Sequence, residues 1–334
     1  MKKILMTGVA GYIGSIAADL FLKNGYQVVG IDNFATGYRQ PIELLKEKYG
    51  EKFIFYEKDL RDDFDEVFEK EKDIEAVVHY AASCIVDESM KDPGKYYQNN
   101  VCGSLNLLKT MDKYQVKKII FSSTCAVYGE AEYFPIDEKH PLRPTTPYGS
   151  SKKMVEEMIE FYGKLKNFSY IILRYFNVCG ASDDGLIGDS KKPSTLLVQN
   201  AVRGALGIEP FKLTCPEVDT PDKTPIRDFI NVVDLNEAHL LALKKIEEKN
   251  MKEVINLGTG TGNSVLEIVN KVQEITGVRF KVEKGETRQG DDPKKIASIE
   301  KAKKILGWRP KRTIEDSVRS LIVWYNKHPN GWDK

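Results

Sequence analysis

The chain has 334 residues, of which 41% are hydrophobic and 30% are charged. Lys and Arg total 50 and Asp and Glu total 49, so no overall charge excess draws the protein to nucleic acid or to a membrane surface. A chain of this size can bury a large core without disulfides or metal ions, in one large α/β domain and a smaller region. Because the net charge is close to zero, an anionic ligand must be bound by basic residues placed close to its site.

The cysteines form no Cys-x-x-Cys pair and lie in apolar stretches, a pattern typical of reduced thiols in a cytoplasmic protein. They are Cys84, Cys102, Cys125, Cys179 and Cys215. No apolar run is long enough to span a bilayer, and the N-terminus carries no signal-peptide core. We therefore expect a cytoplasmic protein with no metal site, no membrane contact and no nucleic-acid partner.

The first half of the chain alternates short apolar runs with helical patterns. The runs predict strands at Ile4–Thr7, Gln27–Asp32, Phe53–Tyr56, Ala76–Tyr80, Lys118–Ser122 and Tyr170–Arg174. The helical patterns between them are Tyr12–Asn24, Ile42–Tyr49, Asp63–Glu69, Lys95–Tyr114 and Ser150–Lys166. Because the strands are continuously apolar, we expect them to be buried on both faces of a parallel sheet. The expected fold class is α/β, a doubly wound parallel sheet of the Rossmann type with a smaller C-terminal α/β region.

After Asn177 the regular alternation ends. A loop rich in Gly, Asp and Lys at 180–192 and one rich in Pro and Thr at 216–225 flank an expected helix near Leu196–Leu206. Further expected elements are helices near Asp234–Glu247, Val265–Thr276 and Ile314–Asn326, and a strand at Glu253–Leu257. Asp234 and Glu237 are spaced as a helix capping box. We predict a cofactor-binding domain over residues 1–176 and a mainly substrate-binding region over 177–334, with residues 228–258 returning to the main sheet.

A glycine-rich turn, Gly8-Val9-Ala10-Gly11-Tyr12-Ile13-Gly14, lies between the first expected strand and the first expected helix. Its glycines let the backbone approach a pyrophosphate, which the helix N-terminus attracts through unpaired N–H groups. Asp32 ends the second expected strand, where a carboxylate can bind the adenosine ribose hydroxyls and repel a 2′-phosphate. Asp59, at the end of the third strand, is suitably placed for adenine. The pattern favours NAD over NADP; the alternative is that these segments are ordinary turns.

Tyr148 and Lys152 are four residues apart, so one helical turn places them on the same face. Lowering a phenol pKa from near 10 to near 7 requires about 4 kcal/mol of preferential stabilisation of the phenolate. A hydrogen-bonded ammonium and a bound nicotinamide cation can supply it. The hydroxyl of Thr124, at the end of a strand, can hold a substrate oxygen beside Tyr148. The alternatives are a solvated helix face for the pair and a backbone-bonded strand end for Thr124.

The order and spacing of these motifs resemble the UDP-glucose (UDP-galactose) 4-epimerases of the extended short-chain dehydrogenase/reductase family, along essentially the whole chain. The resemblance is carried by Gly8-x-x-Gly11-Tyr12-Ile13-Gly14, Asp32-Asn33, His79-Tyr80-Ala81-Ala82, Asn99-Asn100-Val101, Ser122-Ser123-Thr124, Tyr148-x-x-x-Lys152, Arg174-Tyr175-Phe176-Asn177, Thr224-x-x-Arg227-Asp228-Phe229, Arg288-x-Gly290-Asp291 and Leu306-Gly307-Trp308.

This resemblance implies reversible inversion of a UDP-sugar at C4 through a 4-keto sugar, with Tyr148, Lys152 and Thr124 as catalytic residues. It implies a tightly bound NAD held by Gly8, Gly11, Tyr12, Ile13, Gly14, Asp32, Asn33, Thr36, Asp59, Leu60, Tyr80, Ala81, Ala82, Asn99, Ser122, Lys152 and Tyr175. It implies a UDP-sugar held by Thr124, Tyr148, Asn177, Leu197, Leu213, Arg227, Arg288 and Asp291. It also implies a homodimer that pairs the helices predicted at Lys95–Tyr114 and Ser150–Lys166.

The chain departs from the family pattern at four places. Cys84 stands where the family often has Lys, Leu196 follows Ser194-Thr195 where a polar residue is usual, and Thr214-Cys215 replaces Phe-Gly. Lys295 stands where the family controls sugar size, which favours plain hexoses or pentoses, or an acidic sugar such as glucuronate. Cys125-Ala126-Val127 after Thr124 lacks the Asp-Glu pair of sugar-nucleotide dehydratases, so water elimination is disfavoured.

Two other interpretations remain open. One is another enzyme on the same scaffold, a UDP-pentose or UDP-uronate epimerase or a net sugar-nucleotide oxidoreductase, which would consume free NAD. The other is a non-catalytic NAD-binding protein, which would be expected to lose the Tyr148 and Lys152 pair.

Overall fold

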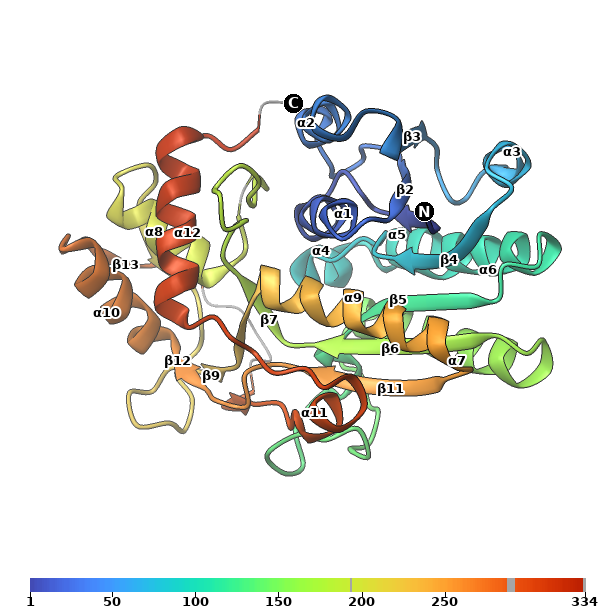
Figure 1. Ribbon diagram of the computed structural model, residues 1–334. Helices are drawn as coiled ribbons and strands as arrows, with labels where there is room; N and C mark the ends of the chain where they lie inside the picture. The colour runs from blue at the N-terminus through green and yellow to red at the C-terminus, as the bar shows by residue number, and fades with distance from the viewer. Residues whose placement is uncertain (193, 287–291, 333–334) are drawn as a thin grey trace.

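The computed structural model describes residues 1–192, 194–286 and 292–332. Its centre is a seven-stranded parallel sheet with the strand order β11-β6-β5-β4-β1-β2-β3 (Figure 1). The strands are β1 (Lys3–Thr7), β2 (Gln27–Asp32), β3 (Phe53–Glu57), β4 (Ile74–His79), β5 (Lys118–Thr124), β6 (Ser169–Tyr175) and β11 (Lys252–Leu257). The order runs outward from β1 in both directions, which confirms the predicted doubly wound sheet.

Both faces of the sheet are covered, as the continuously apolar strands predict. Ile4, Leu5 and Met6 of β1 are all 0% exposed, and neighbouring residues belong to different cores. One core is closed by α1 (Tyr12–Lys23), α2 (Arg39–Tyr49), α9 (Val232–Glu248) and α11 (Glu300–Leu306). The other is closed by α3 (Asp65–Lys70), α6 (Gly103–Lys113) and α7 (Pro147–Leu165).

The later part of the chain builds a third core around α8 (Leu197–Ala205), α10 (Val265–Thr276) and α12 (Ile314–Lys327). Short strands frame it: β7 (Asn177–Cys179) pairs with β10 (Phe229–Asn231), β8 (Phe211–Leu213) with β13 (Val282–Lys284), and β9 (Ile226–Arg227) with β12 (Asn263–Ser264) and β14 (Lys294–Lys295). Between these pieces the chain returns to the main sheet through α9 and β11.

The expected helix at Lys95–Tyr114 is present as a continuous helical segment of α5 (Pro93–Tyr96), a π-helical turn (Tyr97–Cys102) and α6. The π-helical turn and the preceding α4 (Val86–Lys91) were not predicted. The predicted capping box at Asp234 and Glu237 is wrong. Helix α9 begins at Val232, and the side chain of Asn231 caps it by accepting a bond from the Val233 N–H at 2.8 Å.

Asp234 does not cap the helix, because its carboxylate binds residues in the C-terminal part of the chain. It accepts the backbone N–H groups of Lys311 and Arg312, each at 2.7 Å, and pairs with the Arg312 guanidinium at 2.5 Å.

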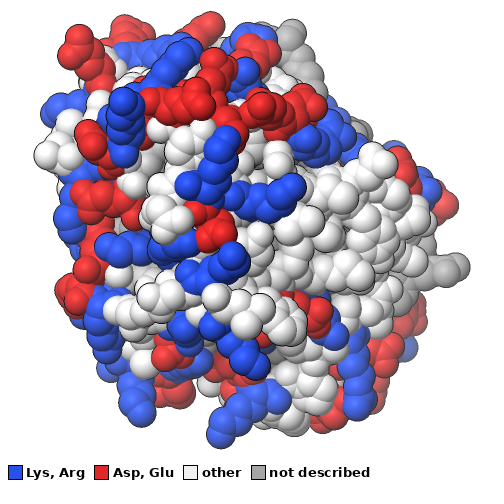
Figure 2. Space-filling model, turned by 90° about the vertical axis from the view of Figure 1, so that its right-hand side faces the viewer, with Lys and Arg blue, Asp and Glu red and all other residues white. Residues whose placement is uncertain are grey.

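Within the described residues no helix is both long enough and apolar enough to cross a membrane. Side chains of both charges are mixed over much of one face, beside a broad area without charge (Figure 2).

Candidate active site

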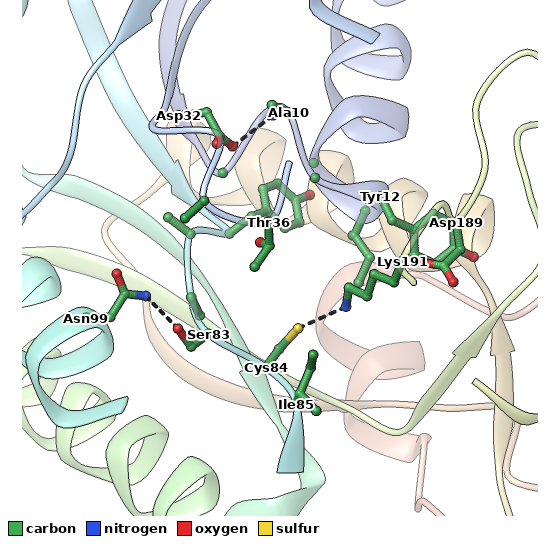
Figure 3. A pocket seen from close by; sticks show the side chains of 18 of the residues that line it. Ala10, Tyr12, Asp32, Thr36, Ser83, Cys84, Ile85, Asn99, Asp189 and Lys191 are labelled. Atoms are coloured by element: carbon green, nitrogen blue, oxygen red, sulfur yellow. Dashed lines mark hydrogen bonds between the residues drawn. The ribbon is translucent and has the colours of Figure 1, made fainter. Parts of the chain in front are cut away.

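A cavity of about 460 Å³ opens at the carboxyl ends of the parallel strands (Figure 3). The structure brings most of the predicted site residues into it: Gly8, Gly11, Tyr12, Ile13, Gly14, Asp32, Asn33, Thr36, Asp59, Leu60, Tyr80, Ala81, Ala82, Asn99, Thr124, Tyr148, Lys152, Tyr175 and Asn177. Ser122, Leu197, Leu213 and Arg227 do not line it. Arg288 and Asp291 lie outside the described residues.

The turn between β1 and α1 requires glycine for two reasons. Gly8 has a φ of +73°, and a Cβ there would lie 2.6 Å from the backbone nitrogen of Ala81. A Cβ on Gly14 would lie 2.1 Å from the Gly8 carbonyl oxygen. Helix α1 starts after Gly11 with no side-chain cap and no acidic residue in its first turn. Its N-terminal N–H groups therefore face the cavity as an anion site, which fits a dinucleotide pyrophosphate.

At the adenosine end, Asp32 is held by backbone N–H groups. Its carboxylate accepts from Ala10 at 2.9 Å and from Phe34 at 2.8 Å, which leaves further lone pairs for ribose hydroxyls (Figure 3). Burial raises the pKa of Asp32, and these N–H bonds oppose that rise. Asn33 donates to Asp59 at 2.7 Å. The Arg61 guanidinium holds the pKa of Asp59 well below its usual range.

The reactive side chains meet where β5 ends and α7 begins. Tyr148, Lys152 and Thr124 are 7%, 3% and 7% exposed. Thr146 caps α7 by accepting a bond from the Gly149 N–H at 3.1 Å. A Cβ on Gly149 would lie 2.6 Å from the Ala126 carbonyl oxygen, so glycine lets the start of the helix pack directly against the segment after Thr124.

Tyr148 and Lys152, both described in the structure, are not hydrogen-bonded to each other, contrary to the prediction. The Lys152 ammonium instead donates to the Ser122 carbonyl at 2.8 Å. Burial lowers the pKa of Lys152 to about 8, and the charges of Cys84 and Glu156 oppose this. Burial raises the pKa of Tyr148 well above its ordinary value, while a hydrogen bond with Thr124 lowers it. The phenol therefore needs a further positive charge beside it, and a bound nicotinamide cation fits that need.

Ser122 acts through Lys152 rather than by lining the cavity. Besides its carbonyl bond to Lys152, its hydroxyl is 3.0 Å from Nε2 of His239 on α9. The His239 ring packs against Tyr80, with centroids 4.7 Å apart, and burial lowers the pKa of His239 to about 4. A neutral histidine thus supports both the cofactor loop and the strand that carries Ser122. Its role depends on a contact between β5 and α9, which spacing along the chain does not reveal.

A buried ion pair fixes α7 one turn beyond Lys152. Arg174 on β6 donates to Glu156 from Nη2 at 2.5 Å and from Nε at 3.0 and 3.1 Å. The Ser123 hydroxyl also donates to Glu156, and both charged side chains are less than 5% exposed. This pair ties α7 to β5 and β6, and so holds Tyr148 and Lys152 beside the end of β5.

The π-helical turn supports the loop that follows β4. Asn100 accepts the Ser83 N–H at 2.8 Å and donates to the Ser83 carbonyl at 3.0 Å and to the Ser151 hydroxyl at 3.0 Å. The adjacent Asn99, which lines the cavity, donates to the Ser83 hydroxyl at 3.1 Å (Figure 3). Two consecutive amides therefore hold one cofactor-facing loop against α7.

Of the residues predicted to bind the uridine diphosphate, Asn177 lines the cavity and Arg227 lies beyond its lining. Arg227 donates to the carbonyls of Ile226 at 3.0 Å and Asp292 at 2.8 Å. Lys295 pairs with the Asp292 carboxylate at 2.5 Å. Burial raises the pKa of Cys125, the residue after Thr124, and the charges of Lys295 and Arg227 lower it.

A doubly wound sheet with a glycine-rich dinucleotide loop, and a Tyr148–Lys152 pair on the adjoining helix, defines a nicotinamide-dependent short-chain dehydrogenase/reductase. Residues 4–258 match the model of the NAD dependent epimerase/dehydratase family, and the chain belongs to that family. The predicted family and the predicted cofactor are thereby confirmed.

Similar proteins cover the whole chain. The UDP-glucose 4-epimerase of Lactobacillus helveticus is 40% identical over 335 residues, which cover 99% of each protein. That of Bacillus subtilis (strain 168) is 40% identical over 98% of each. A crystal structure of a UDP-glucose 4-epimerase is similar with a TM-score of 0.93, at 41% identity over 100% of both chains. A UDP-glucose 4-epimerase from Bifidobacterium longum, in complex with NAD+ and UDP, has a TM-score of 0.93 and 36% identity over 99% of this chain and 100% of its own.

Proposed function

We propose that the protein catalyses the reversible C4 epimerisation of UDP-glucose and UDP-galactose with bound NAD. One observation carries the proposal: a single cavity joins a pyrophosphate loop and Asp32 at one end to Tyr148, Lys152 and Thr124 at the other. A dinucleotide laid along it reaches from the adenosine site to the reactive phenol. The similarity to UDP-glucose 4-epimerases over the full chain supports the same reaction.

In this mechanism Tyr148 removes the proton from the sugar 4-hydroxyl, and the Thr124 hydroxyl orients that oxygen. When bound, NAD supplies the acceptor and the donor of the hydride that leaves and returns to C4. Lys152, anchored on the Ser122 carbonyl, contributes the positive charge that favours the phenolate. The 4-keto sugar turns in the site, hydrogen returns to its opposite face, and Tyr148 gives back the proton.

Firm contacts to the diphosphate and loose contacts to the sugar would let the 4-keto sugar turn in the site. Asn177, Arg227, Arg288 and Asp291 bind the uridine diphosphate in this proposal, with residues 1–176 as the NAD-binding domain and 177–334 mainly as the UDP-sugar region. Arginine suits this task because its planar fork binds phosphates bidentately. Lys295 already pairs with Asp292 at 2.5 Å, which favours a neutral sugar over a uronate.

We also propose that the protein is a cytoplasmic homodimer formed through α6 and α7. The outer faces of these helices expose several large apolar side chains, namely Leu105, Met154, Phe161 and Leu165, of which Phe161 is 60% and Leu165 is 70% exposed. Such side chains favour burial against a second copy. All five cysteines are free thiols, as is usual in the reducing cytoplasm.

A coupled assay of the purified protein with UDP-glucose, UDP-N-acetylglucosamine, UDP-xylose and UDP-glucuronate tests the reaction and the sugar. We expect conversion of UDP-glucose without net NADH. Steady NADH accumulation would instead identify a net oxidoreductase, preferential turnover of UDP-xylose or UDP-glucuronate would identify the alternative epimerases, and NAD binding without any turnover would identify a binding protein.

The Tyr148→Phe variant tests the assigned base. We expect kcat to fall by at least about 100-fold while bound NAD is retained, since one phenolic oxygen is removed from the proton path. Tyr162→Phe on the same helix is the control, because Tyr162 lies outside the cavity and its variant should turn over normally. A Tyr148→Phe enzyme with near-normal kcat would exclude Tyr148 as the base.

A further inference from the structure

The loop at residues 188–192 carries a lysine into the cofactor cavity from the later part of the chain. Its backbone is anchored on both sides: the Asp189 carbonyl accepts from the Trp324 indole at 3.2 Å, and the Ser190 carbonyl accepts from the Tyr38 hydroxyl at 2.5 Å. Lys191 then lines the cavity, whereas Lys192 is exposed outside it. Of these two adjacent lysines, only Lys191 lines the cavity.

The ammonium of Lys191 spans the cavity to the loop after β4, where it donates to Sγ of Cys84 at 3.0 Å (Figure 3). A thiol sulfur is a weak acceptor, and an ammonium has three donors. Cys84 and Asp189 raise the pKa of Lys191, so the side chain is a cation at neutral pH. No described carboxylate forms an ion pair with it, so Lys191 keeps donors for a stronger acceptor.

Lys191 differs in this respect from the other basic side chains of the cavity. Within the described residues these have oxygen partners: Lys58 on Glu66 at 2.5 Å, Arg61 on Asp59 at 2.7 Å, Lys95 on Glu88 at 2.6 Å, and Lys152 on the Ser122 carbonyl at 2.8 Å. Within the described residues the Lys191 ammonium is hydrogen-bonded to a thiol and to no oxygen, so in a cavity suited to an anionic ligand it can bind that ligand's charge.

The position of Cys84 indicates which anion this is. The loop after β4 touches the glycine-rich turn, since a Cβ on Gly8 would lie 2.6 Å from the Ala81 nitrogen. The charge of Asp189 acts both on the Tyr12 phenol and on the Lys191 ammonium, which relates Lys191 to the N-terminus of α1. Tyr12, the first residue of that helix, lies near Asp189, the loop residue two positions before Lys191 (Figure 3).

We propose that Lys191 is a cofactor-binding residue whose ammonium leaves the Cys84 sulfur to bind a phosphate oxygen of the NAD diphosphate, opposite the N-terminus of α1. This inference rests on the proposed function. It assigns to the later part of the chain a direct contact with the cofactor. Release of NAD then requires that this contact break, so Lys191 slows cofactor exchange.

The test compares Lys191→Met with Lys192→Met, a matched change one residue away. Each holoprotein is mixed with excess isotopically labelled NAD, and the exchange of bound cofactor is followed by gel filtration and mass spectrometry. Loss of one charge-assisted hydrogen bond should speed exchange by roughly 10- to 100-fold in Lys191→Met. Lys192→Met should exchange like the wild type, and Lys191→Arg, which keeps the charge, should recover most of the slow exchange.

Three results would overturn the inference. The first is a Lys191→Met protein that is folded, by circular dichroism, and exchanges NAD within about twofold of Lys192→Met, far below the change expected for a charge-assisted bond. The second is a Lys191→Met protein in which only the KM for the UDP-sugar rises, which would assign the ammonium to the substrate instead. If the wild type itself neither contains nor exchanges NAD, the proposed function falls together with the inference, and this outcome is distinct from the first two.

Discussion

The buried His79 should make the free energy of unfolding depend on pH. It ends β4 and links the end of β1 to α6, because Nδ1 lies 2.7 Å from the Thr7 hydroxyl and Nε2 lies 2.8 Å from the Ser104 hydroxyl. Ser104 donates its own proton to the Asn100 carbonyl at 2.5 Å, so it accepts from Nε2–H. Nδ1 must then accept from Thr7, which requires the neutral ring.

Burial lowers the pKa of His79 to about 3, with a smaller effect of the Lys152 charge. An unfolded histidine titrates near 6.5, so at lower pH the unfolded chain binds a proton that the folded chain excludes. The stabilising effect of the neutral ring is therefore complete above about pH 6.5 and is lost as the pH falls from there toward 3. At about 1.4 kcal/mol per pH unit, lowering the pH from 7.5 to 5.5 removes about 1.4 kcal/mol.

The assay is urea unfolding of the wild type and of His79→Asn at pH 7.5 and 5.5, with saturating NAD throughout and detection by circular dichroism. Asparagine keeps an amide acceptor for Thr7 but cannot be protonated. The variant will be less stable at both values, and we expect the difference from the wild type to shrink by about 1.4 kcal/mol at pH 5.5. His239 is present in both proteins and cancels. An equal difference at the two pH values would refute the assignment of a buried neutral imidazole.

Two further substitutions test the packing around the site. Gly8→Ala should lose NAD, because the new Cβ lies 2.6 Å from the Ala81 nitrogen, whereas Gly25→Ala has a similar φ of +85° and nothing within 4 Å. Both should lose about 1–2 kcal/mol of stability to the left-handed backbone, so equal NAD contents after purification would contradict the steric argument. Arg174→Met should lower the free energy of unfolding by about 3–5 kcal/mol, since it leaves Glu156 buried and unpaired. Urea unfolding of the Arg174→Met, Glu156→Met double variant checks this, because it should be more stable than the single variant.

The sheet and the cofactor loop could be predicted because their signals are local. Continuous apolar runs identify parallel strands, and the spacing from Gly8 to Gly14 between a strand and a helix identifies a phosphate loop. The four-residue spacing of Tyr148 and Lys152 predicts a shared helix face in the same way.

Contacts between distant segments explain what the sequence did not show. Asp234 has the spacing of a capping residue, yet its carboxylate is taken by Arg312, 78 residues away. Lys191 and Cys84 are 107 residues apart and meet only because a loop of the later region crosses the cavity. The bond of Lys152 to a strand carbonyl depends on how α7 packs on β5, which no periodicity reports.

The π-helical turn at Tyr97–Cys102 affects how a one-residue length difference between this chain and a relative should be interpreted. Its backbone bonds span five residues instead of four, so the segment holds one residue more than an ordinary helix over the same path. Deleting Asn99 would let α5 and α6 join as a continuous α-helix, with both ends still in phase. A relative shorter by one residue at this point would thus keep the fold and still lack one of the two amides on Ser83, so a single-residue gap in an alignment would report an altered cofactor contact.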